Sequence, residues 1–293
     1  MGDKAFKEAS RPVRSSPTGR HLRLGAELRK LREGAGLTAT QAGRLLGVKQ
    51  NQVSNMEAGR VGVSAERIRF LADNYQYRDM KVVEALCGMT ADRTRGWWEE
   101  YRGVLPTPLL DLAEAEHHAA GLLTAVTVHI PGLLQTPEHA QEIFHQDAPE
   151  LSPHEIEHRV SFRMQRQNVL HRDPPTPQQV VIHEAALRMQ FGGAQVARHQ
   201  LEHLLTTSEL PHVEIRVIPF SAGAFAGSGQ SIYYVHGPVQ QLDSVNLDQS
   251  HGPVFLDAED QLAKYRVLLK RIRDIALPPE QSRQFIHNIA RSL

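Results

Sequence analysis

Residues 37–59, LTATQAGRLLGVKQNQVSNMEAG, constrain the fold of this chain more than any other stretch. Their pattern predicts two short helices joined by a tight turn, over about residues 39–46 and 50–58. Thr38 is a natural N-cap for the first helix, and Gln41 three residues later completes a capping box. Gly47 ends that helix, because glycine adopts the left-handed C′ conformation without a Cβ clash. This spacing is typical of a helix-turn-helix.

The apolar residues of the two helices indicate which faces are buried. We expect Ala42, Leu45 and Leu46 to form the inward face of the first helix. The second helix offers only Val53 and Met56, one turn apart. Its remaining face is rich in amide side chains, which makes it poorly suited to burial.

Amide side chains on an exposed helix face suit DNA recognition, because Gln and Asn can pair bidentately with adenine in the major groove. We therefore predict base reading by Gln50, Asn51, Gln52 and Asn55. We predict contacts to the DNA phosphates from Thr38, Gln41, Arg44, Lys49 and Arg60. The alternative is a surface helix hairpin that binds nothing. The turn spacing, the agreeing caps and the helices on either side favour DNA binding.

Charge is distributed unevenly along a chain whose net charge is zero. Residues 1–74 contain 14 Lys and Arg against 7 Asp and Glu, so this quarter carries +7 and the remainder carries −7. A basic module on an acidic body is typical of a DNA-binding head with a separate effector part.

Composition excludes several classes of protein. With 293 residues, 41% hydrophobic and 23% charged, the chain can form one large or two ordinary globular domains. The single cysteine, Cys87, excludes an internal disulfide and a cysteine-based zinc finger. No apolar run reaches the roughly eighteen residues of a membrane span, and no signal-peptide core is present. We expect a cytoplasmic protein.

The flanks of the central stretch supply the other helices of a small domain. Residues 1–20 are predicted to be a disordered basic arm, because they contain almost nothing to bury. Helices are expected over about residues 22–33, after Ser64, and after Asp79. We therefore predict a five-helix DNA-binding domain over residues 21–90.

The rest of the chain mixes helical and strand patterns. Residues 91–108 are predicted to be a connecting helix whose aromatic residues, Trp97, Trp98 and Tyr101, pack the two domains together. Residues 109–293 are predicted to form an α/β domain with a mostly central sheet. Its strands are expected at residues 124–130, 179–183, 213–219, 231–236 and 245–247. The predicted fold class is thus α+β, an all-α domain followed by an α/β domain.

Residues 22–90 resemble the Xre, or lambda-repressor-like, helix-turn-helix family. The resemblance rests on LRKLREGAGLT, on RLLGVKQNQVSNMEAGR and on the helix after Ser64. The chain departs from many relatives at Ala39, Lys49 and Asn55, where they often carry Gln, Ser, and Arg or Lys. These departures concern DNA contacts and leave the fold implied by the resemblance intact.

From GWWEEYR onward, the chain resembles the C-terminal domain of unknown function of actinobacterial WhiJ-like, or antitoxin-like, transcriptional regulators. The matching segments are IPGLLQT, HRVSFRMQRQ, HEAALR, QLEHLL, ELPHVEIRVIPFSAGAFAG and AKYRVLLKRI. The resemblance implies a small companion protein as one partner. The chain has Phe225 where relatives often carry His.

Three further patterns are candidate sites. His154–His158 matches H-E-x-x-H and His199–His203 matches H-x-x-E-H, but neither has an evident third metal ligand. The glycine-rich loop at residues 221–229 lacks the lysine of a phosphate-binding loop. We interpret it as a flexible hairpin loop, with a lid over a small-molecule pocket as the alternative.

Together these patterns predict a transcriptional regulator that binds double-stranded DNA, most simply as a homodimer. Its C-terminal domain is expected to bind a partner protein or a small ligand. We expect no enzymatic activity, no metal and no cofactor. The alternatives are an antitoxin-like interaction protein and a metal-dependent hydrolase.

Overall fold

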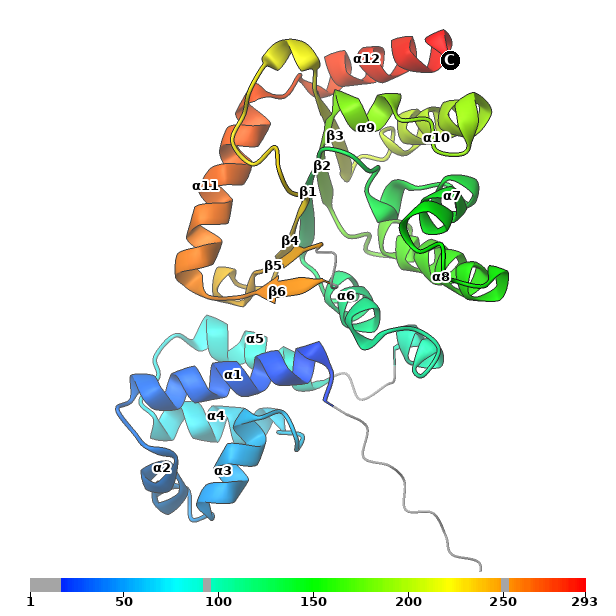
Figure 1. The fold of residues 1–293 in the computed structure, drawn as a ribbon. Coiled ribbons are helices and arrows are strands. Elements are labelled where there is room, and N and C mark those ends of the chain that lie inside the picture. Colours follow the sequence, from blue (N-terminus) through cyan, green and yellow to red (C-terminus); the bar gives the residue numbers. More distant parts are fainter. Residues whose placement is uncertain (1–16, 92–95, 249–252) are drawn as a thin grey trace, which may run out of the picture. The chain divides into compact units, whose positions relative to one another are not determined.

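The protein is described by a computed structural model that covers residues 17–91, 96–248 and 253–293 (Figure 1). The chain divides into two compact units, residues 1–92 and residues 93–293. Most of the predicted arm lies outside the described residues. The first helix begins at Gly19, inside the predicted arm, because the Thr18 side chain accepts a hydrogen bond from the backbone N–H of His21.

The first unit contains five helices in its described part, which confirms the predicted all-α architecture. They are α1 (Gly19–Gly34), α2 (Ala39–Leu45), α3 (Gln50–Glu57), α4 (Ala65–Asn74) and α5 (Met80–Ala91). The expected caps are present at Ser64, which accepts a hydrogen bond from the backbone of Arg67, and at Asp79, which accepts from the backbone of Val82. These local signals fix where α4 and α5 begin.

One apolar core holds the five helices together. Its fully buried members include Leu28, Ala42, Val53, Ile68, Leu71, Val83 and Leu86. Leu45 was predicted wrongly to be part of it, since Leu45 is 49% exposed. The buried face of α2 runs through Ala42, Gly43 and Leu46 instead, which turns Leu45 outward. Met56 is only half-buried.

In its described residues, the second unit is built on a mixed sheet of six strands, in the order β3-β2-β1-β4-β5-β6. Strands β1, β2 and β3 are parallel to one another, whereas β4, β5 and β6 pair antiparallel with their neighbours. The strands are β1 (Gly121–Val126), β2 (Gln178–His183), β3 (Val213–Ile218), β4 (Ile232–His236), β5 (Ser244–Leu247) and β6 (Val254–Leu256).

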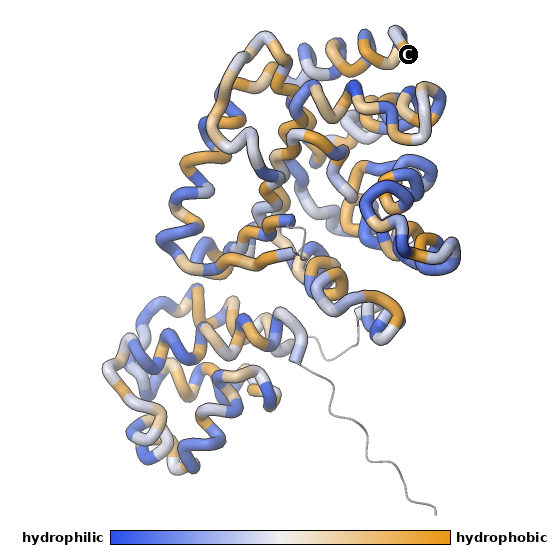
Figure 2. Tube along the Cα trace, in the orientation of Figure 1, coloured by the Kyte–Doolittle hydropathy of each residue, from blue (hydrophilic) through white to orange (hydrophobic). Residues whose placement is uncertain are grey.

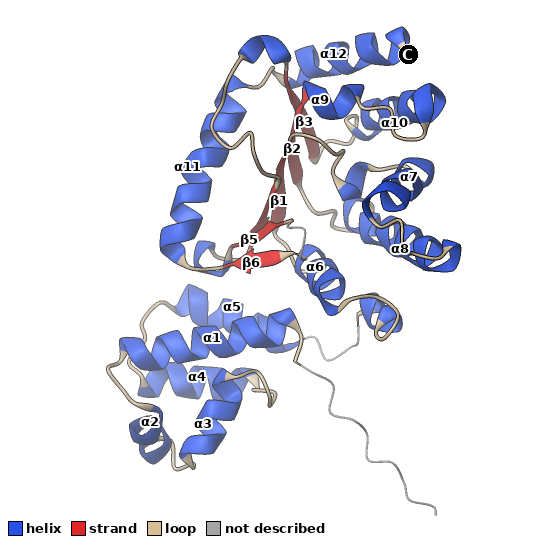
Figure 3. Cartoon of the chain, in the orientation of Figure 1, coloured by secondary structure: helices blue, strands red, loops and turns tan. Residues whose placement is uncertain are grey.

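Helices cover both faces of this sheet, so the unit has three layers (Figure 3). Its α-helices are α6 (Thr107–His117), α7 (Pro137–Asp147), α8 (Pro153–Arg166), α9 (Glu184–Arg188), α10 (Gly193–Thr207), α11 (Glu259–Ile275) and α12 (Pro279–Ser292). Its short 3-10 helices are η1 (Trp97–Tyr101), η2 (Gly132–Leu134), η3 (Gln167–Leu170), η4 (Phe220–Ala222) and η5 (Gln240–Leu242). The predicted α+β fold class, with a central sheet in the second unit, is confirmed.

The alternation of side chains along each strand divides the core between the two faces. On β2, Val180 and Ile182 face the cluster that contains Leu204 of α10 and Ile286 of α12. Val181, between them, faces the cluster formed with α11. Hydrophobic and hydrophilic residues alternate along α11 in Figure 2, as expected for a helix that buries one side.

Several elements differ from the sequence prediction: strand β6 was not expected, and β1 ends at Val126 rather than at residue 130. Strand β1 begins at Gly121, three residues before the predicted start, because its register is set by pairing with β2 and β4. Between α5 and α6, where a connecting helix was predicted over residues 91–108, the described residues contain the short 3-10 helix η1. Gly103, with a φ of 83°, turns the chain soon after it.

The aromatic side chains of η1 pack onto α6 and α8. The Trp97 ring lies 5.2 Å from the ring of Phe162, and Trp98 lies 5.0 Å from the ring of His117. The Tyr101 hydroxyl donates to Gln165 at 3.2 Å. The contacts described for these rings thus lie within the second unit, whereas we expected them to pack the two domains together.

Strand β3 forms one edge of the sheet, and the chain that follows α11 covers part of this edge. The backbone N–H of Val217 donates to the Ser282 hydroxyl at 2.9 Å, and the Val217 carbonyl accepts from the backbone N–H of Leu277 at 2.9 Å. At the start of the strand, the N–H of Val213 donates to the carbonyl of Leu210.

Candidate nucleic-acid interface

Helices α2 and α3 are joined as the sequence predicted. The Thr38 hydroxyl accepts from the backbone N–H of Gln41 at 3.2 Å, and the Gln41 side-chain oxygen accepts from the backbone N–H of Thr38 at 2.8 Å. Gly47 ends α2 with a φ of 65°. A Cβ at Gly43 would lie 2.9 Å from the carbonyl oxygen of Val48, so only glycine allows the turn to fold back so closely on α2.

Helix α3 presents its amide side chains to solvent. Val53 is buried, while Gln50, Asn51 and Gln52 are exposed and Asn55 is half-buried. The predicted base-reading residues therefore lie together on one short helix. The more deeply set Asn55 leaves Gln50, Asn51 and Gln52 as the most accessible amides.

The side chain of Gln52 also takes part in capping α3. Its Oε1 atom accepts a hydrogen bond from the backbone N–H of Lys49 at 3.1 Å. A bidentate contact with adenine requires both the amide oxygen and the amide nitrogen. While the cap is intact, one lone pair of this oxygen is engaged, and the amide N–H groups of Gln52 stay fully available to DNA.

Helix α1 fixes the position of α3 through close backbone contact at two glycines. A Cβ at Gly25 would lie 2.4 Å from the carbonyl oxygen of Glu57, at the end of α3. A Cβ at Gly59 would lie 2.8 Å from the carbonyl oxygen of His21, and Gly59 has a φ of 65°. These glycines let α3 rest against α1 at a separation that no larger residue permits.

A buried ion pair joins the same two helices. Arg32 donates from Nε to Glu57 Oε1 at 2.6 Å and from Nη2 to Glu57 Oε2 at 3.0 Å. Both side chains are almost fully buried, and Arg32 also donates to the carbonyl of Leu37 at 2.6 Å. The hydrogen bond and charge of Glu57 raise the pKa of Arg32. Such a bidentate pair adds geometric constraint to the placement of α3.

Sequence reasoning missed this ion pair, although one signal was present. Arg32 follows Leu24 and Leu28 at i, i+4 and i+8, on the buried stripe of α1. A charged residue on such a stripe requires a buried partner. Its partner, Glu57, lies 25 residues further on, where no local pattern identifies it.

The residues predicted to contact phosphates lie around α2 and α3. Thr38, Gln41, Arg44, Lys49 and Arg60 are all exposed. The side chains of Thr38 and Gln41 are engaged with one another, with the hydroxyl of Thr38 donating to Gln41 Oε1 at 2.8 Å. Lys49 is the N-cap residue of α3, and its side chain makes no capping hydrogen bond. Its ammonium group can therefore reach outward.

In the second unit, the segments IPGLLQT and HRVSFRMQRQ pack against each other. Gln135 accepts from Arg163 at 2.6 Å, and Gln167 donates to the backbone carbonyl of Gln135 at 2.7 Å. Arg166 pairs bidentately with Glu116 at 2.6 and 2.8 Å, and both are buried. Burial, and then the neighbouring Arg166, lower the pKa of Arg163 to about 10.

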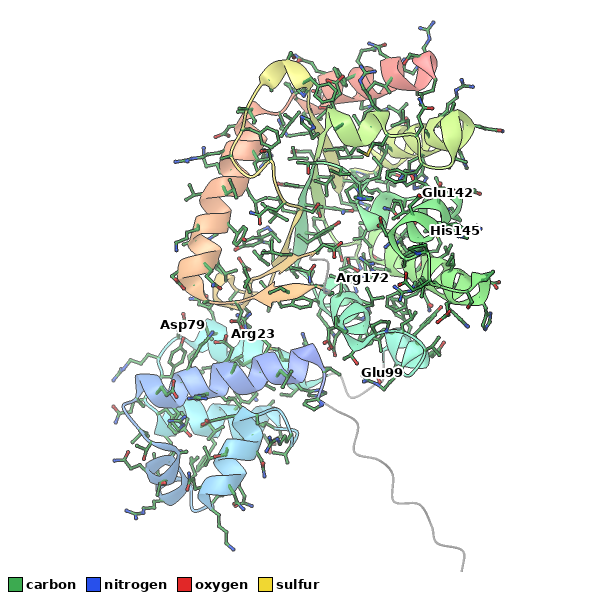
Figure 4. All side chains as sticks on the ribbon, viewed as in Figure 1. Arg23, Asp79, Glu99, Glu142, His145 and Arg172 are labelled. Atoms are coloured by element: carbon green, nitrogen blue, oxygen red, sulfur yellow. The ribbon has the colours of Figure 1, made fainter. Side chains whose placement is uncertain are left out.

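Two other polar groups support the same region. Gln200 of α10 accepts from the backbone N–H of Thr136 at 2.8 Å and donates to the carbonyl of Leu134 at 2.7 Å. Arg172, labelled in Figure 4, donates to the carbonyl of His117 at 2.7 Å and to the hydroxyl of Thr176 at 2.8 Å. Many polar side chains of these segments thus make hydrogen bonds that stabilise the fold.

The two histidine strings do not form metal centres in the described residues. His154 and His158 lie on an exposed part of α8 with their Nε2 atoms 3.0 Å apart. His199 lies 3.7 Å from Glu138, and burial, followed by His199, lowers the pKa of its neighbour His203. Across the described ranges, no three His, Cys, Asp or Glu side chains come together in a way that could hold a metal ion.

The loop at residues 221–229 packs toward α11. A Cβ at Gly227 would lie 3.0 Å from the Ile272 side chain, and Phe225 packs against the apolar cluster beneath α11. The ring of Phe225 lies 5.5 Å from that of His183. Phe225 thus serves the core of the second unit.

Cys87, on α5, is buried, as expected for a small core residue. Burial raises the pKa of its thiol, and its sulfur donates to the carbonyl of Ala65 at 3.4 Å. It is therefore a structural residue of the first unit.

Comparison with known families agrees with the two units. Residues 23–87 match a helix-turn-helix domain family, and residues 109–288 match the family described as a domain of unknown function (DUF5753). The second match covers more than half of the chain. The chain belongs to this DUF5753 family. No curated protein and no solved structure matches it.

The helix-turn-helix match identifies the first unit as the DNA-binding part of a regulator. Among the described residues, no helix is both long enough and apolar enough to cross a membrane. The chain thus carries a helix-turn-helix domain in its first unit, followed by a DUF5753 domain in its second unit.

Proposed function

We propose that this protein is a sequence-specific transcriptional regulator in which α3 enters the major groove of DNA. The observation that carries the proposal is an exposed row of amide side chains on a helix anchored from behind by Gly25 and the Arg32–Glu57 pair. Rigid placement matters because base contacts depend on the exact position of the side chains. We assign this reader to the Xre group, as the sequence resemblance implies.

The proposed contacts divide between bases and phosphates. Gln50 and Asn51 have exposed amides for bidentate contacts. Gln52 contributes its amide N–H groups, because its oxygen caps α3. Asn55, which is half-buried, also contacts a base. Phosphates are held by the exposed residues Thr38, Gln41, Arg44, Lys49 and Arg60.

The test begins by sequencing DNA fragments retained by the purified protein, which identifies the operator. Asn51→Ala should then weaken operator binding by about 1–3 kcal/mol and relax preference at one base position. Gln261→Ala, an exposed amide on α11, is the matched control and should bind like wild type. If Asn51→Ala retains both affinity and specificity, α3 is not the reader.

We propose that the protein binds DNA as a homodimer on a pseudo-palindromic site. One helix-turn-helix unit reads few bases, and a two-fold pair matches half-sites roughly 34–36 Å apart. Light scattering of the free protein and of its operator complex should give the mass of two chains. A single chain in both states would contradict the proposal.

For the second unit we propose an effector role, in which binding of a partner or small ligand changes the affinity for DNA. DNA recognition resides in the first unit, and the acidic remainder of the chain does not favour contact with phosphates. We propose binding rather than catalysis, because the histidine strings lie apart from any ligand set and the buried Arg166–Glu116 pair and Gln200 are engaged in structural hydrogen bonds. The resemblance to antitoxin-like regulators favours a small companion protein as one effector.

The effector role has a direct test in fluorescence anisotropy of labelled operator DNA. The companion protein encoded beside such a regulator, titrated into the complex, should shift operator affinity measurably. If the full-length protein binds the operator with equal affinity with and without saturating companion protein, the companion is not an effector.

A further inference from the structure

A cavity of about 310 Å³ opens between the sheet and α11. Its floor is formed by Leu123 of β1 together with Tyr234 and His236 of β4, and Leu269 of α11 closes the apolar part. Leu123 and Tyr234 are paired across the two strands, so their side chains stand on the same face. None of residues 221–229 lines this cavity. Its volume is at the lower end of the range for small-molecule sites.

The side of α11 that lines this cavity is largely basic. Arg266, Leu269, Lys270 and Arg273 follow the spacing i, i+3, i+4, i+7, and Asp274 lines the cavity as well. Three of these five residues are basic. The buried face of the helix and its C-cap consists of Leu262, Leu269, Ile272 and Ala276. The basic side chains therefore lie beside the core-facing residues and border the cavity.

The inner end of the cavity carries a preorganised polar network. Asp243, almost fully buried, accepts from the Tyr234 hydroxyl at 2.7 Å and from the backbone N–H of Gly237 at 2.9 Å. Arg266 donates to the same hydroxyl at 2.9 Å. Burial acts to raise the pKa of Asp243, but hydrogen bonds from His236, Tyr234 and Gly237 outweigh it and hold that pKa below its usual value. The carboxylate therefore stays ionised and holds the Tyr234 hydroxyl in place.

His236 lies beside this network and lines the cavity. Its Nδ1 atom lies 3.8 Å from Asp243 Oδ2, its ring lies 4.9 Å from that of Tyr234, and its side chain is 45% exposed.

The basic residues of α11 are available to a ligand. Lys270 pairs at 2.8 Å with Asp274, which also lines the cavity, but both side chains are largely exposed, and such pairs contribute little. Arg273 pairs with Glu214, which also accepts from Arg216 at 2.7 Å. Glu214 therefore retains a partner when Arg273 turns to a ligand. Neither Glu214 nor Arg216 lines the cavity.

We propose that this cavity binds a small amphipathic anion, an organic acid with an apolar or aromatic body. The body lies on Leu123, Leu269 and the ring of Tyr234, and the acid group meets Lys270 and Arg273. An apolar floor with a basic wall selects for both parts of such a molecule. The site deepens the effector role proposed above, and its regulatory meaning rests on that role, whereas the binding itself does not.

The probe for this site is 1-anilinonaphthalene-8-sulfonate, an aromatic sulfonate whose fluorescence rises in apolar surroundings. N-phenyl-1-naphthylamine has the same aromatic body without the charge. The full-length protein should bind the sulfonate at least about 10-fold more tightly than the amine, as expected for charge-assisted contacts. Equal affinities would overturn the assignment of an anion site.

Two matched double variants locate the binding. Lys270→Gln with Arg273→Gln removes two cations from the cavity wall, and should weaken sulfonate binding by roughly 10-fold or more without affecting the amine. Lys264→Gln with Arg271→Gln removes the same charge from exposed positions of α11 that do not line the cavity, and should bind like wild type. Equal losses in both double variants would show a general charge effect and overturn the site.

A third variant tests the floor. Leu123→Trp places a larger side chain into the cavity and should abolish the binding of both probes, with circular dichroism confirming the fold. If the sulfonate still binds to this variant at wild-type affinity, it occupies another surface and the assignment fails.

Operator binding separates this proposal from the effector role. Sulfonate that binds through Lys270 and Arg273 but leaves operator anisotropy unchanged supports the anion site and counts against small-ligand regulation. A shift in operator affinity that survives in the Lys270→Gln, Arg273→Gln double variant supports an effector role and overturns this cavity as its origin.

Discussion

Replacing Glu57 with alanine should destabilise the first unit and displace its recognition helix. The substitution leaves the buried Arg32 guanidinium without the two hydrogen bonds, at 2.6 and 3.0 Å, that neutralise it. Removing one partner of a buried ion pair costs about 3–5 kcal/mol. Arg32 keeps its hydrogen bonds to the Leu37 carbonyl and to Glu33, so we expect a loss near the lower limit, about 3 kcal/mol.

That loss is large for a unit of this size. At roughly 0.05–0.15 kcal/mol per residue, a domain of this length has a free energy of unfolding of about 4–11 kcal/mol. Tryptophan fluorescence distinguishes the two units in this assay, because both tryptophans, Trp97 and Trp98, belong to the second unit. Circular dichroism follows both units during urea unfolding, whereas tryptophan fluorescence follows the second alone.

The expected result is an earlier unfolding transition seen by circular dichroism and absent from fluorescence. The double variant Arg32→Met with Glu57→Leu should recover most of the loss, because apolar residues can replace a buried pair at little cost. Operator binding by this double variant then reports whether the pair is needed to place α3. The reasoning is refuted if Glu57→Ala leaves the transition unchanged, or if the double variant is less stable than Glu57→Ala.

Three further outcomes are expected. Gly25→Ala should destabilise the first unit by about 1–3 kcal/mol and weaken operator binding, since its Cβ would meet the Glu57 carbonyl. Gly34→Ala, in open space, should stabilise slightly in the same urea titration. Lys49→Ala should lower the slope of log affinity against log salt by about 1, and an unchanged slope would remove Lys49 from the phosphate contacts. Burial lowers the pKa of His139 to about 4, so its neutral form stabilises the second unit above about pH 6.5. That contribution, about 3 kcal/mol, should disappear as the pH falls to 4, and His139→Phe should flatten this dependence in tryptophan-monitored unfolding.

Local signals in the sequence predicted the helix-turn-helix well. Capping at Thr38 with Gln41 and the left-handed Gly47 depend on residues within one turn of each other, and the structure confirms both. Leu45 was misplaced because burial depends on what lies opposite. Gly43, which the backbone of Val48 approaches closely, lies on the buried face of α2, and Leu45 lies outside that face.

Features that join distant segments escaped prediction. Arg32 and Glu57 meet across 25 residues, and the start of β1 is set by its pairing with β2 and β4. The cavity under α11 combines a strand near residue 123 with a helix near residue 270. Periodicity in the sequence does not predict contact between these two segments, because each segment alone has the pattern of an ordinary amphipathic element.

The covered edge of β3 has a consequence for how copies of this protein can associate. The outward N–H and C=O groups of Val217 are already bonded to Ser282 and Leu277, and the N–H of Val213 is bonded to Leu210. A strand from another molecule could not extend the sheet there without displacing the start of α12. The opposite edge strand, β6, is only three residues long. Edge-to-edge association of the sheet is therefore disfavoured, and with it the open-ended, fibril-like stacking of sheets.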